Sequence, residues 1–200
     1  MEDKNIDSDN NIKLDEFNLS EFYKLNNGHL SNFLILGYAC SGKTTLIKNF
    51  MIELKQNDII NDIILFVTED NDYLDIISQP RFINYINFNN LESITNTIKN
   101  IMEEQIKLTD TKIKPKLLIF DNSTVCFPLS PLDKQIDPDI LDLIENPNKY
   151  NIILILTSEM SFGYYKYRCK FKNIIIFKET CLTEKHKLHT HYLKEIITFT

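Results

Sequence analysis

Several common features are scarce or absent in this chain of 200 residues, and each absence excludes a class of protein. It has four glycines, two arginines and no tryptophan. No apolar run approaches 18 residues and no secretory signal peptide is recognisable, so we expect no membrane-spanning segment. The four cysteines form no C-x-x-C pair, which disfavours zinc ribbons and disulfide scaffolds. We therefore expect a soluble, intracellular protein with reduced thiols.

The net charge of −6 is concentrated at one end of the chain. Residues 1–21 hold seven acids and two lysines, a balance of −5, which leaves about −1 for the remainder. This acidic, Asn-rich stretch is predicted to be a disordered tail, followed by one domain over residues 22–200. A domain so close to neutral neither demands nor excludes a nucleic-acid partner.

A phosphate-binding loop is the most specific pattern in the sequence. The apolar run 33–36 is followed by Gly37, four residues, and then Gly42-Lys43-Thr44, which completes G-x-x-x-x-G-K-[ST] ahead of a helical apolar stripe. Such a turn points backbone N–H groups at an anion, with a lysine for the β- and γ-phosphates and a hydroxyl for Mg²⁺. The predicted nucleotide contacts are Gly37, Tyr38, Ala39, Cys40, Ser41, Gly42, Lys43, Thr44 and Thr45.

Apolar strands alternate with amphipathic helices along the rest of the chain. Continuously apolar strands indicate a sheet covered on both faces, and the alternation indicates parallel βαβ units. The predicted fold is therefore α/β, a P-loop NTPase of the RecA-like (ASCE) type with a mostly parallel sheet between helices. Strands are predicted at 33–36, 63–67, 83–88, 117–120, 152–156 and 174–177, and helices at 44–56, 73–78, 91–108 and from 137, while 188–199 is ambiguous.

Acidic residues follow several of these strands and supply candidate catalytic groups. Asp121, at the tip of a buried strand, is predicted to hold Mg²⁺ opposite Thr44. Asn122 comes next, where hydrolysing motors usually carry a second acid, and an amide can orient a water but cannot take its proton. Glu69 and Glu159 end other strands and are candidates to replace that acid, with solvated loop acids as the alternative.

The strand predicted at 152–156 ends in Thr157-Ser158-Glu159. In P-loop ATPases with one strand inserted between the two Walker strands, this tip faces the γ-phosphate. A polar group there can sense whether that phosphate is present, so these residues are predicted to do so; a plain strand-end cap is the alternative.

A basic and aromatic segment occupies residues 164–172. If it is extended, its basic residues share one face and are a candidate contact for DNA phosphates. Arg168 is alternatively an arginine finger for a neighbouring subunit, or the segment is an edge strand protected by lysines. The basic positions are Lys166, Arg168, Lys170 and Lys172. Four further residues suggest a metal but match no standard zinc spacing: Cys181, His186, His189 and His191.

The order of these motifs resembles that of the genome-packaging ATPases of nucleocytoplasmic large DNA viruses, the poxvirus-type branch of the FtsK–HerA superfamily. The resemblance runs from about residue 32 to residue 193. It is carried by the phosphate loop with Thr45-Leu-Ile, Ile64-Leu-Phe-Val-Thr-Glu69 with Tyr73 and Pro80, Leu118-Ile-Phe-Asp121, Tyr150-Asn-Ile-Ile, Thr157-Ser158, Arg168 and Asn173-Ile-Ile-Ile-Phe177.

The resemblance implies an ATP- and Mg²⁺-dependent motor, a homo-oligomeric ring that moves double-stranded DNA into a preformed capsid through capsid or portal-type proteins. It implies a place in the host-cell cytoplasm, in the viral factory, or in the virion. Three departures bear on turnover: Asn122 replaces an acid, Glu159 replaces the usual Gln, and Asn148-Lys149 replaces Arg-His. Loss of an arginine finger can cost about 10³–10⁵ in rate, so slow hydrolysis with intact ATP binding is expected if these positions matter.

Two other functions remain open at this point. A nucleoside or nucleotide kinase also carries a phosphate loop, but its lid and substrate site need arginines, and the chain has only Arg81 and Arg168. A degenerate scaffold that binds nucleotide without hydrolysing it is suggested by the three departures from the family pattern.

Overall fold

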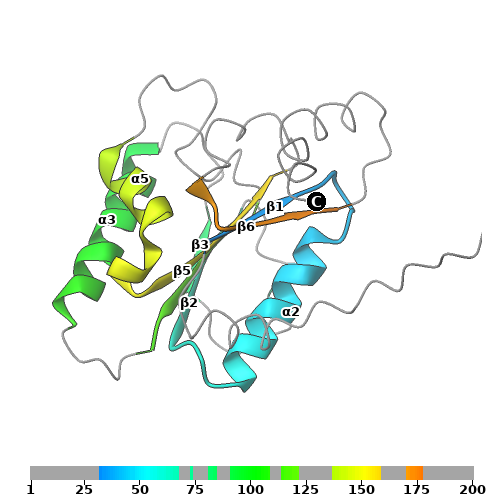
Figure 1. The fold of residues 1–200 in the computed structure, drawn as a ribbon, viewed down its shortest axis with the longest axis horizontal. Coiled ribbons are helices and arrows are strands. Elements are labelled where there is room, and N and C mark those ends of the chain that lie inside the picture. Colours follow the sequence, from blue (N-terminus) through cyan, green and yellow to red (C-terminus); the bar gives the residue numbers. More distant parts are fainter. Residues whose placement is uncertain are drawn as a thin grey trace, which may run out of the picture.

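The computed structural model describes residues 32–67, 73, 81–84, 91–108, 114–121, 137–158 and 170–177. These residues form a six-stranded sheet with helices on both of its faces (Figure 1). The strands are β1 (Asn32–Leu36), β2 (Asp62–Val67), β3 (Arg81–Asn84), β4 (Lys116–Phe120), β5 (Ile152–Ser158) and β6 (Asn173–Ile176). The helices are α2 (Lys43–Gln56), α3 (Leu91–Lys107), α5 (Pro138–Glu145) and the 3₁₀ helix η2 (Pro147–Tyr150).

The strand order is β3-β2-β4-β5-β1-β6, and every neighbouring pair is parallel. β5 therefore lies between β1, which leads into the phosphate loop, and β4, which leads to Asp121. All six carboxyl ends meet at one edge of the sheet, where ligands of open α/β folds bind. The α/β fold of the P-loop NTPase type that the sequence predicts is thereby confirmed.

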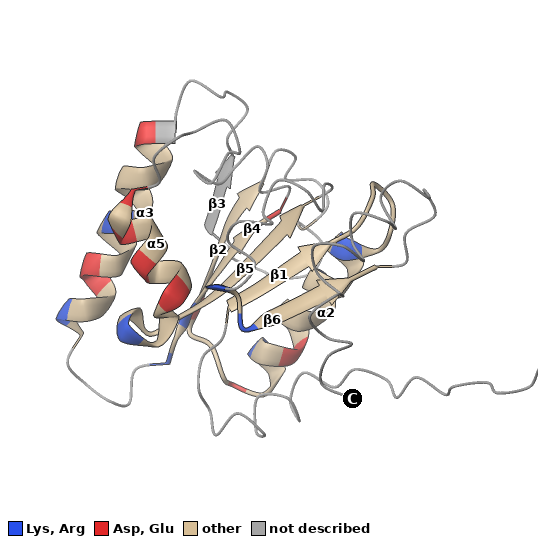
Figure 2. Ribbon diagram, turned by 45° about the horizontal axis from the view of Figure 1, so that its top comes forward, with Lys and Arg blue, Asp and Glu red and all other residues tan. Residues whose placement is uncertain are grey.

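The strands are apolar at nearly every position because both faces of the sheet are covered. In β1, Phe33 and Ile35 pack in the core beneath α2, whereas Leu34 and Leu36 pack in the core beneath α3, α5 and η2. Figure 1 shows these two helical layers on opposite sides of the sheet. Figure 2 shows the complementary pattern, with charged residues on the helices and at strand ends. Each fully buried Leu or Ile contributes roughly 2 kcal/mol to this packing.

Local signals explain where the helices begin and which face they bury. The Asp137 side chain accepts a hydrogen bond from the backbone N–H of Asp139 at 2.9 Å, and Pro138 occupies the first helical position of α5. α3 buries one stripe that includes Ile94, Ile98 and Ile101. Both helix predictions are confirmed.

The start of β3 differs from the prediction. The sequence predicts a strand at 83–88, whereas β3 begins two residues earlier, at Arg81, and is described to Asn84; residues 85–88 lie outside the described residues. Its position is fixed by pairing with β2, where Ile64 lies opposite Arg81, rather than by its own apolar residues. The predicted tail at 1–21, all but the first residue of the helix at 73–78, and the stretch 188–199 lie outside the described residues. Within the described part of the chain, no helix is both long and apolar enough to cross a bilayer.

Candidate nucleotide site

The phosphate loop joins β1 to α2 at the carboxyl edge of the sheet. The Gly37 N–H donates to the Ser158 carbonyl at 3.1 Å, so the loop starts from the end of the neighbouring strand β5. Cys40 has φ 59° and Gly42 has φ 102°, both in the left-handed region. The chain thus reverses direction within the loop and enters α2 at Lys43.

The two motif glycines sit where a side chain would not fit. A Cβ on Gly37 would lie 2.6 Å from Ser41 Oγ and 2.9 Å from Phe177 Cβ. A Cβ on Gly42 would lie 3.3 Å from the Phe177 ring, in a backbone conformation that L-residues rarely adopt. The Phe177 side chain therefore packs against the loop and holds its two glycines close to β6.

The side chains inside the loop are arranged as an anion site requires. The Lys43 ammonium donates to the carbonyls of Gly37 at 2.7 Å and Tyr38 at 2.6 Å, and Lys43 is only 7% exposed. Ser41 Oγ is buried without a hydrogen-bond partner among the described residues. A buried cation and an unpartnered hydroxyl beside a helix N-terminus fit a phosphate group.

Asp121 is held by three hydroxyl groups that come from three different elements. Thr44 at the start of α2 donates to its Oδ2 at 3.1 Å, and Tyr73, between β2 and β3, donates to the same oxygen at 2.5 Å. Thr157 of β5 donates to Oδ1 at 2.7 Å. The Asp121 N–H also donates to the Phe66 carbonyl at 3.0 Å, which ties the backbone to β2.

The oxygens of this cluster suit Mg²⁺ better than they suit a transition metal. Mg²⁺ is usually bound through one or two protein oxygens together with waters and substrate phosphates, and Thr44 and Asp121 supply such oxygens. The described part of the chain has no group of three or more His, Cys, Asp or Glu side chains that would form a metal cage. The residues present therefore fit a magnesium ion that arrives with a nucleotide.

The structure brings together only some of the predicted site residues. All nine loop residues, Asp121 and Thr157 lie at the carboxyl edge, and the Thr157 hydroxyl contacts the carboxylate of Asp121. Ser158 contributes its carbonyl to Gly37. Outside the described residues lie Glu69, Asn122, Glu159, Lys166 and Arg168, and also Cys181, His186, His189 and His191.

The end of the predicted basic segment is described at Lys170, Phe171 and Lys172. The two lysines are exposed and flank the buried Phe171, as the predicted alternation requires. However, the Lys170 ammonium pairs with the carboxylate of Glu145 at the end of α5. These residues precede β6, so they lie at the amino edge of the sheet, away from the phosphate loop.

Tyr73 is a contact of Asp121 for which the sequence pattern predicts no role at the site. Its side chain is 1% exposed, and the ammonium of Lys48 lies 5.9 Å from the centre of its ring. The sequence predicts Tyr73 only as the first residue of a helix at 73–78, and hydrophobic periodicity does not identify the acceptor of a hydroxyl group. Its contact with Asp121 follows from the topology, because β2 and β4 are neighbours and residues that follow both strands meet at one edge.

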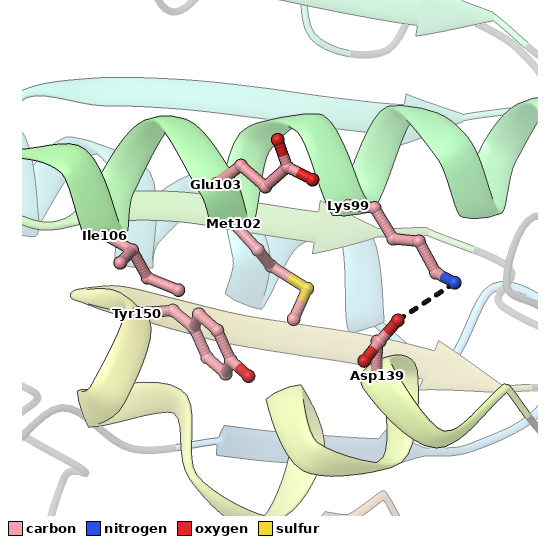
Figure 3. Close-up of a pocket in the computed structure, with 6 residues that line it drawn as sticks. All are labelled: Lys99, Met102, Glu103, Ile106, Asp139 and Tyr150. Atoms are coloured by element: carbon pink, nitrogen blue, oxygen red, sulfur yellow. Dashed lines mark ion pairs between the residues drawn. The ribbon is translucent and has the colours of Figure 1, made fainter.

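A separate pocket of about 160 Å³ lies between α3 and the α5–η2 layer. Figure 3 shows Met102 and Ile106 of α3 facing Tyr150, with Lys99 paired to Asp139 at 2.9 Å. This pocket is on the face of the sheet opposite α2, so it is not part of the phosphate site.

The sheet order, the glycine turn and the hydroxyl-bound aspartate together define a RecA-like P-loop NTPase fold. No protein-family model and no curated protein sequence matches the chain. Its fold is similar to the genome packaging NTPase B204 of Sulfolobus turreted icosahedral virus 2, solved in complex with ATP-gammaS. The TM-score is 0.60 at 18% identity, covering 82% of this chain and 83% of that one.

A second similar structure is the cytoplasmic domain of EssC, with a TM-score of 0.60 at 17% identity. That match covers 79% of this chain but only 35% of the EssC chain. B204 described as the DNA-packaging ATPase of Sulfolobus turreted icosahedral virus also matches, with a TM-score of 0.60 and 19% identity. At these identities the likeness establishes the fold, which P-loop ATPases of different function share.

Proposed function

We propose that this protein binds ATP with Mg²⁺ at the phosphate loop and hydrolyses it to package viral double-stranded DNA. The observation that carries the proposal is the hydrogen bond between Thr44 and Asp121. It joins the start of α2 to the end of β4 across 77 residues of sequence. A phosphate loop alone indicates anion binding, whereas a carboxylate held against its Thr indicates a site for a metal–nucleotide complex.

The residues divide into binding and reacting groups. The N–H groups of the loop and the Lys43 ammonium bind the phosphates, and Thr44 and Asp121 hold the metal. When bound, Mg²⁺ neutralises charge on the phosphate oxygens. Lys43 leaves the carbonyls of Gly37 and Tyr38 to contact the β- and γ-phosphates. Asn122 or Glu159 orients the attacking water, and Arg168 acts on the site of a neighbouring subunit.

The packaging part of the proposal rests on two supports. The order of motifs resembles that of viral packaging ATPases, and solved structures of similar fold include a viral genome packaging NTPase. We infer a homo-oligomeric ring that acts on double-stranded DNA together with capsid or portal-type proteins, in the cytoplasm of an infected cell or in the virion. The strand β5 between β1 and β4 is the arrangement that the resemblance implies.

The test is phosphate release from ATP by the full-length protein, measured with and without double-stranded DNA. We expect Mg²⁺-dependent hydrolysis that DNA stimulates, and a loss of about 100-fold or more in Lys43→Ala. Lys55→Ala is the matched control, because Lys55 lies on the same helix at an exposed position and, among the described residues, donates to the nearby Asn61 carbonyl. An active, folded Lys43→Ala variant contradicts the assignment of the site.

The same assay separates the motor from a nucleotide-binding scaffold. ATP binding without turnover, with or without DNA, indicates the scaffold. Asn122→Asp then tests whether the missing acid is the reason, because an aspartate can accept the proton of the water and an asparagine cannot.

A further inference from the structure

The Asp121 carboxylate accepts hydrogen bonds from residues on both sides of β4, one on β5 and one that follows β2. Thr157 reaches its Oδ1 from β5, and Tyr73 reaches its Oδ2 from the connection that follows β2. β5 and β2 are the two neighbours of β4 in the sheet. The carboxylate therefore has little freedom to rotate, and each of its oxygens is fixed by a separate donor.

We propose that Tyr73 is a positioning residue for the metal site, which holds the Asp121 carboxylate toward Thr44 and the phosphate loop. This inference rests on the proposed function, because it assigns Asp121 to Mg²⁺. The Tyr73 hydroxyl lies closer to Oδ2 than the Thr44 hydroxyl does, at 2.5 Å against 3.1 Å. Because both hydroxyls share the same acceptor, the shorter hydrogen bond is the stronger one, and Tyr73 has the greater effect on the position of this oxygen.

The ring of Tyr73 is itself held in place by α2. Tyr73 is 1% exposed and packs in the core that includes Ile47 and Met51 of α2, with the Lys48 ammonium 5.9 Å from the ring centre. Lys48 lies one helical turn after Thr44. The same helix thus carries the metal-binding hydroxyl and fixes the ring whose hydroxyl orients the carboxylate.

Groups that orient a metal-binding carboxylate tune metal affinity without touching the metal. Loss of such a partner typically costs 10–100-fold in metal affinity or activity. Thr157 and Thr44 remain as donors when the Tyr73 hydroxyl is removed, so we expect the low end of this range. The Mg²⁺ concentration that gives half of the Mg²⁺-dependent gain in nucleotide affinity should rise about tenfold. Binding to the phosphate loop in the absence of Mg²⁺ should not change, since that loop makes no use of Tyr73.

The experiment measures binding of a fluorescent ADP analogue to the full-length protein as Mg²⁺ is added, and again with EDTA. Tyr73→Phe keeps the ring in its core and removes only the hydroxyl. Tyr150→Phe is the matched control, because Tyr150 also donates to a carboxylate, that of Asp142, on the opposite face of the sheet. We expect the Mg²⁺ requirement to rise in the first variant and to match wild type in the second, with EDTA affinities equal in all three.

A double variant separates positioning from general loosening of the fold. If Tyr73 acts through Asp121, then Tyr73→Phe has no further effect on the Mg²⁺ requirement in an Asp121→Asn background, because coupled effects are not additive. Thermal unfolding of each variant shows whether it is folded. Thr157→Val applies the same test to Oδ1 of Asp121, the oxygen to which Thr157 donates. Suppose that wild type binds the nucleotide in a Mg²⁺-dependent way and that folded Tyr73→Phe has the same Mg²⁺ requirement. That result overturns this inference and leaves the proposed function intact. Wild type that binds no nucleotide overturns the proposed function with it.

Discussion

The Thr44 hydroxyl donates to Oδ2 of Asp121 at 3.1 Å, although the two residues are 77 positions apart in the sequence. The contact exists because β4 carries Asp121 to the same sheet edge at which β1 releases the phosphate loop. A threonine that donates its proton to a carboxylate keeps its oxygen lone pairs for a metal. The sheet itself therefore brings these two oxygen-bearing side chains together beside the phosphate loop.

Thr44→Val should uncouple nucleotide binding from Mg²⁺. Valine has the shape of threonine but no oxygen, so the phosphate loop should still bind ADP while the gain in affinity on adding Mg²⁺ falls at least tenfold. Titration calorimetry with and without Mg²⁺ measures both quantities. Thr97→Val is the control, because the Thr97 hydroxyl donates to the carbonyl of Ser93 at 2.8 Å, within α3 on the face of the sheet opposite α2. An equal Mg²⁺ effect in Thr44→Val and Thr97→Val would rule out the role of Thr44.

Asn32→Leu should be one of the most destabilising single substitutions in the described part of the chain. Asn32 is fully buried at the start of β1, where its amide donates to the carbonyls of Ile144 and Lys170 and accepts from the Lys172 N–H at 2.6 Å. Leucine leaves these backbone groups buried without partners, which should lower the free energy of unfolding by about 3 kcal/mol.

Urea unfolding of both proteins measures this difference. Asn57→Leu is the control: its amide donates to the Glu53 carbonyl at 2.9 Å in an exposed position, so the cost there should stay below about 1 kcal/mol. A loss for Asn32→Leu no greater than that of the control would mean that solvent reaches these groups and satisfies them.

The sequence predicts the layers of this fold better than its tertiary polar contacts. Continuously apolar strands such as Leu117–Phe120 require helices on both faces, and the glycine–lysine pattern requires the loop that follows Leu36. The Thr44–Asp121 pairing was also predictable, since both residues follow parallel strands. The start of β3 differs from the prediction by two residues because Arg81 and Phe82 pair with β2, and the sequence of one strand does not reveal which residues of a neighbouring strand it will pair with.

The polar contacts that the sequence did not reveal share one physical cause. Tyr73 and Asn32 are single polar groups in otherwise apolar or irregular stretches, and their partners are backbone or side-chain atoms far along the chain. Periodicity identifies which face of an element is buried, but it does not identify which distant acceptor a buried donor will meet. Such contacts follow from the completed topology.

Acid should selectively weaken the contact between α5 and η2. The Lys149 ammonium, the Tyr150 hydroxyl and the Asn146 amide all donate to Asp142, and they lower the pKa of its carboxyl to about 2 from an ordinary 3.8. Because the folded pKa lies below the unfolded one, this contribution to stability is complete above about pH 4 and is lost as the pH falls toward 2.

Urea unfolding of wild type and Asp142→Asn at several pH values tests this window. Wild type should be the more stable protein near pH 6, and its advantage should shrink as the pH falls from about 4 to about 2. Lys149→Met removes the largest cause of the lowered Asp142 pKa. In that variant the folded-state pKa should move back toward 3.8, so the stability difference should vanish at a higher pH than in wild type. A difference between wild type and Asp142→Asn that stays constant over the whole range would contradict the pairing.

Gln105→Met should stabilise the protein. Gln105 lies near the end of α3 and is 3% exposed, and among the described residues neither its amide nitrogen nor its amide oxygen has a hydrogen-bond partner. A buried amide without partners costs about 1–3 kcal/mol, whereas methionine has a similar length and gains from the same burial. We expect the free energy of unfolding to rise by about 1–2 kcal/mol in urea titrations. Gln56→Met, at the exposed end of α2, should change it by less than about 0.5 kcal/mol. A Gln105→Met variant that is less stable than wild type would contradict the inference that this buried amide lacks partners.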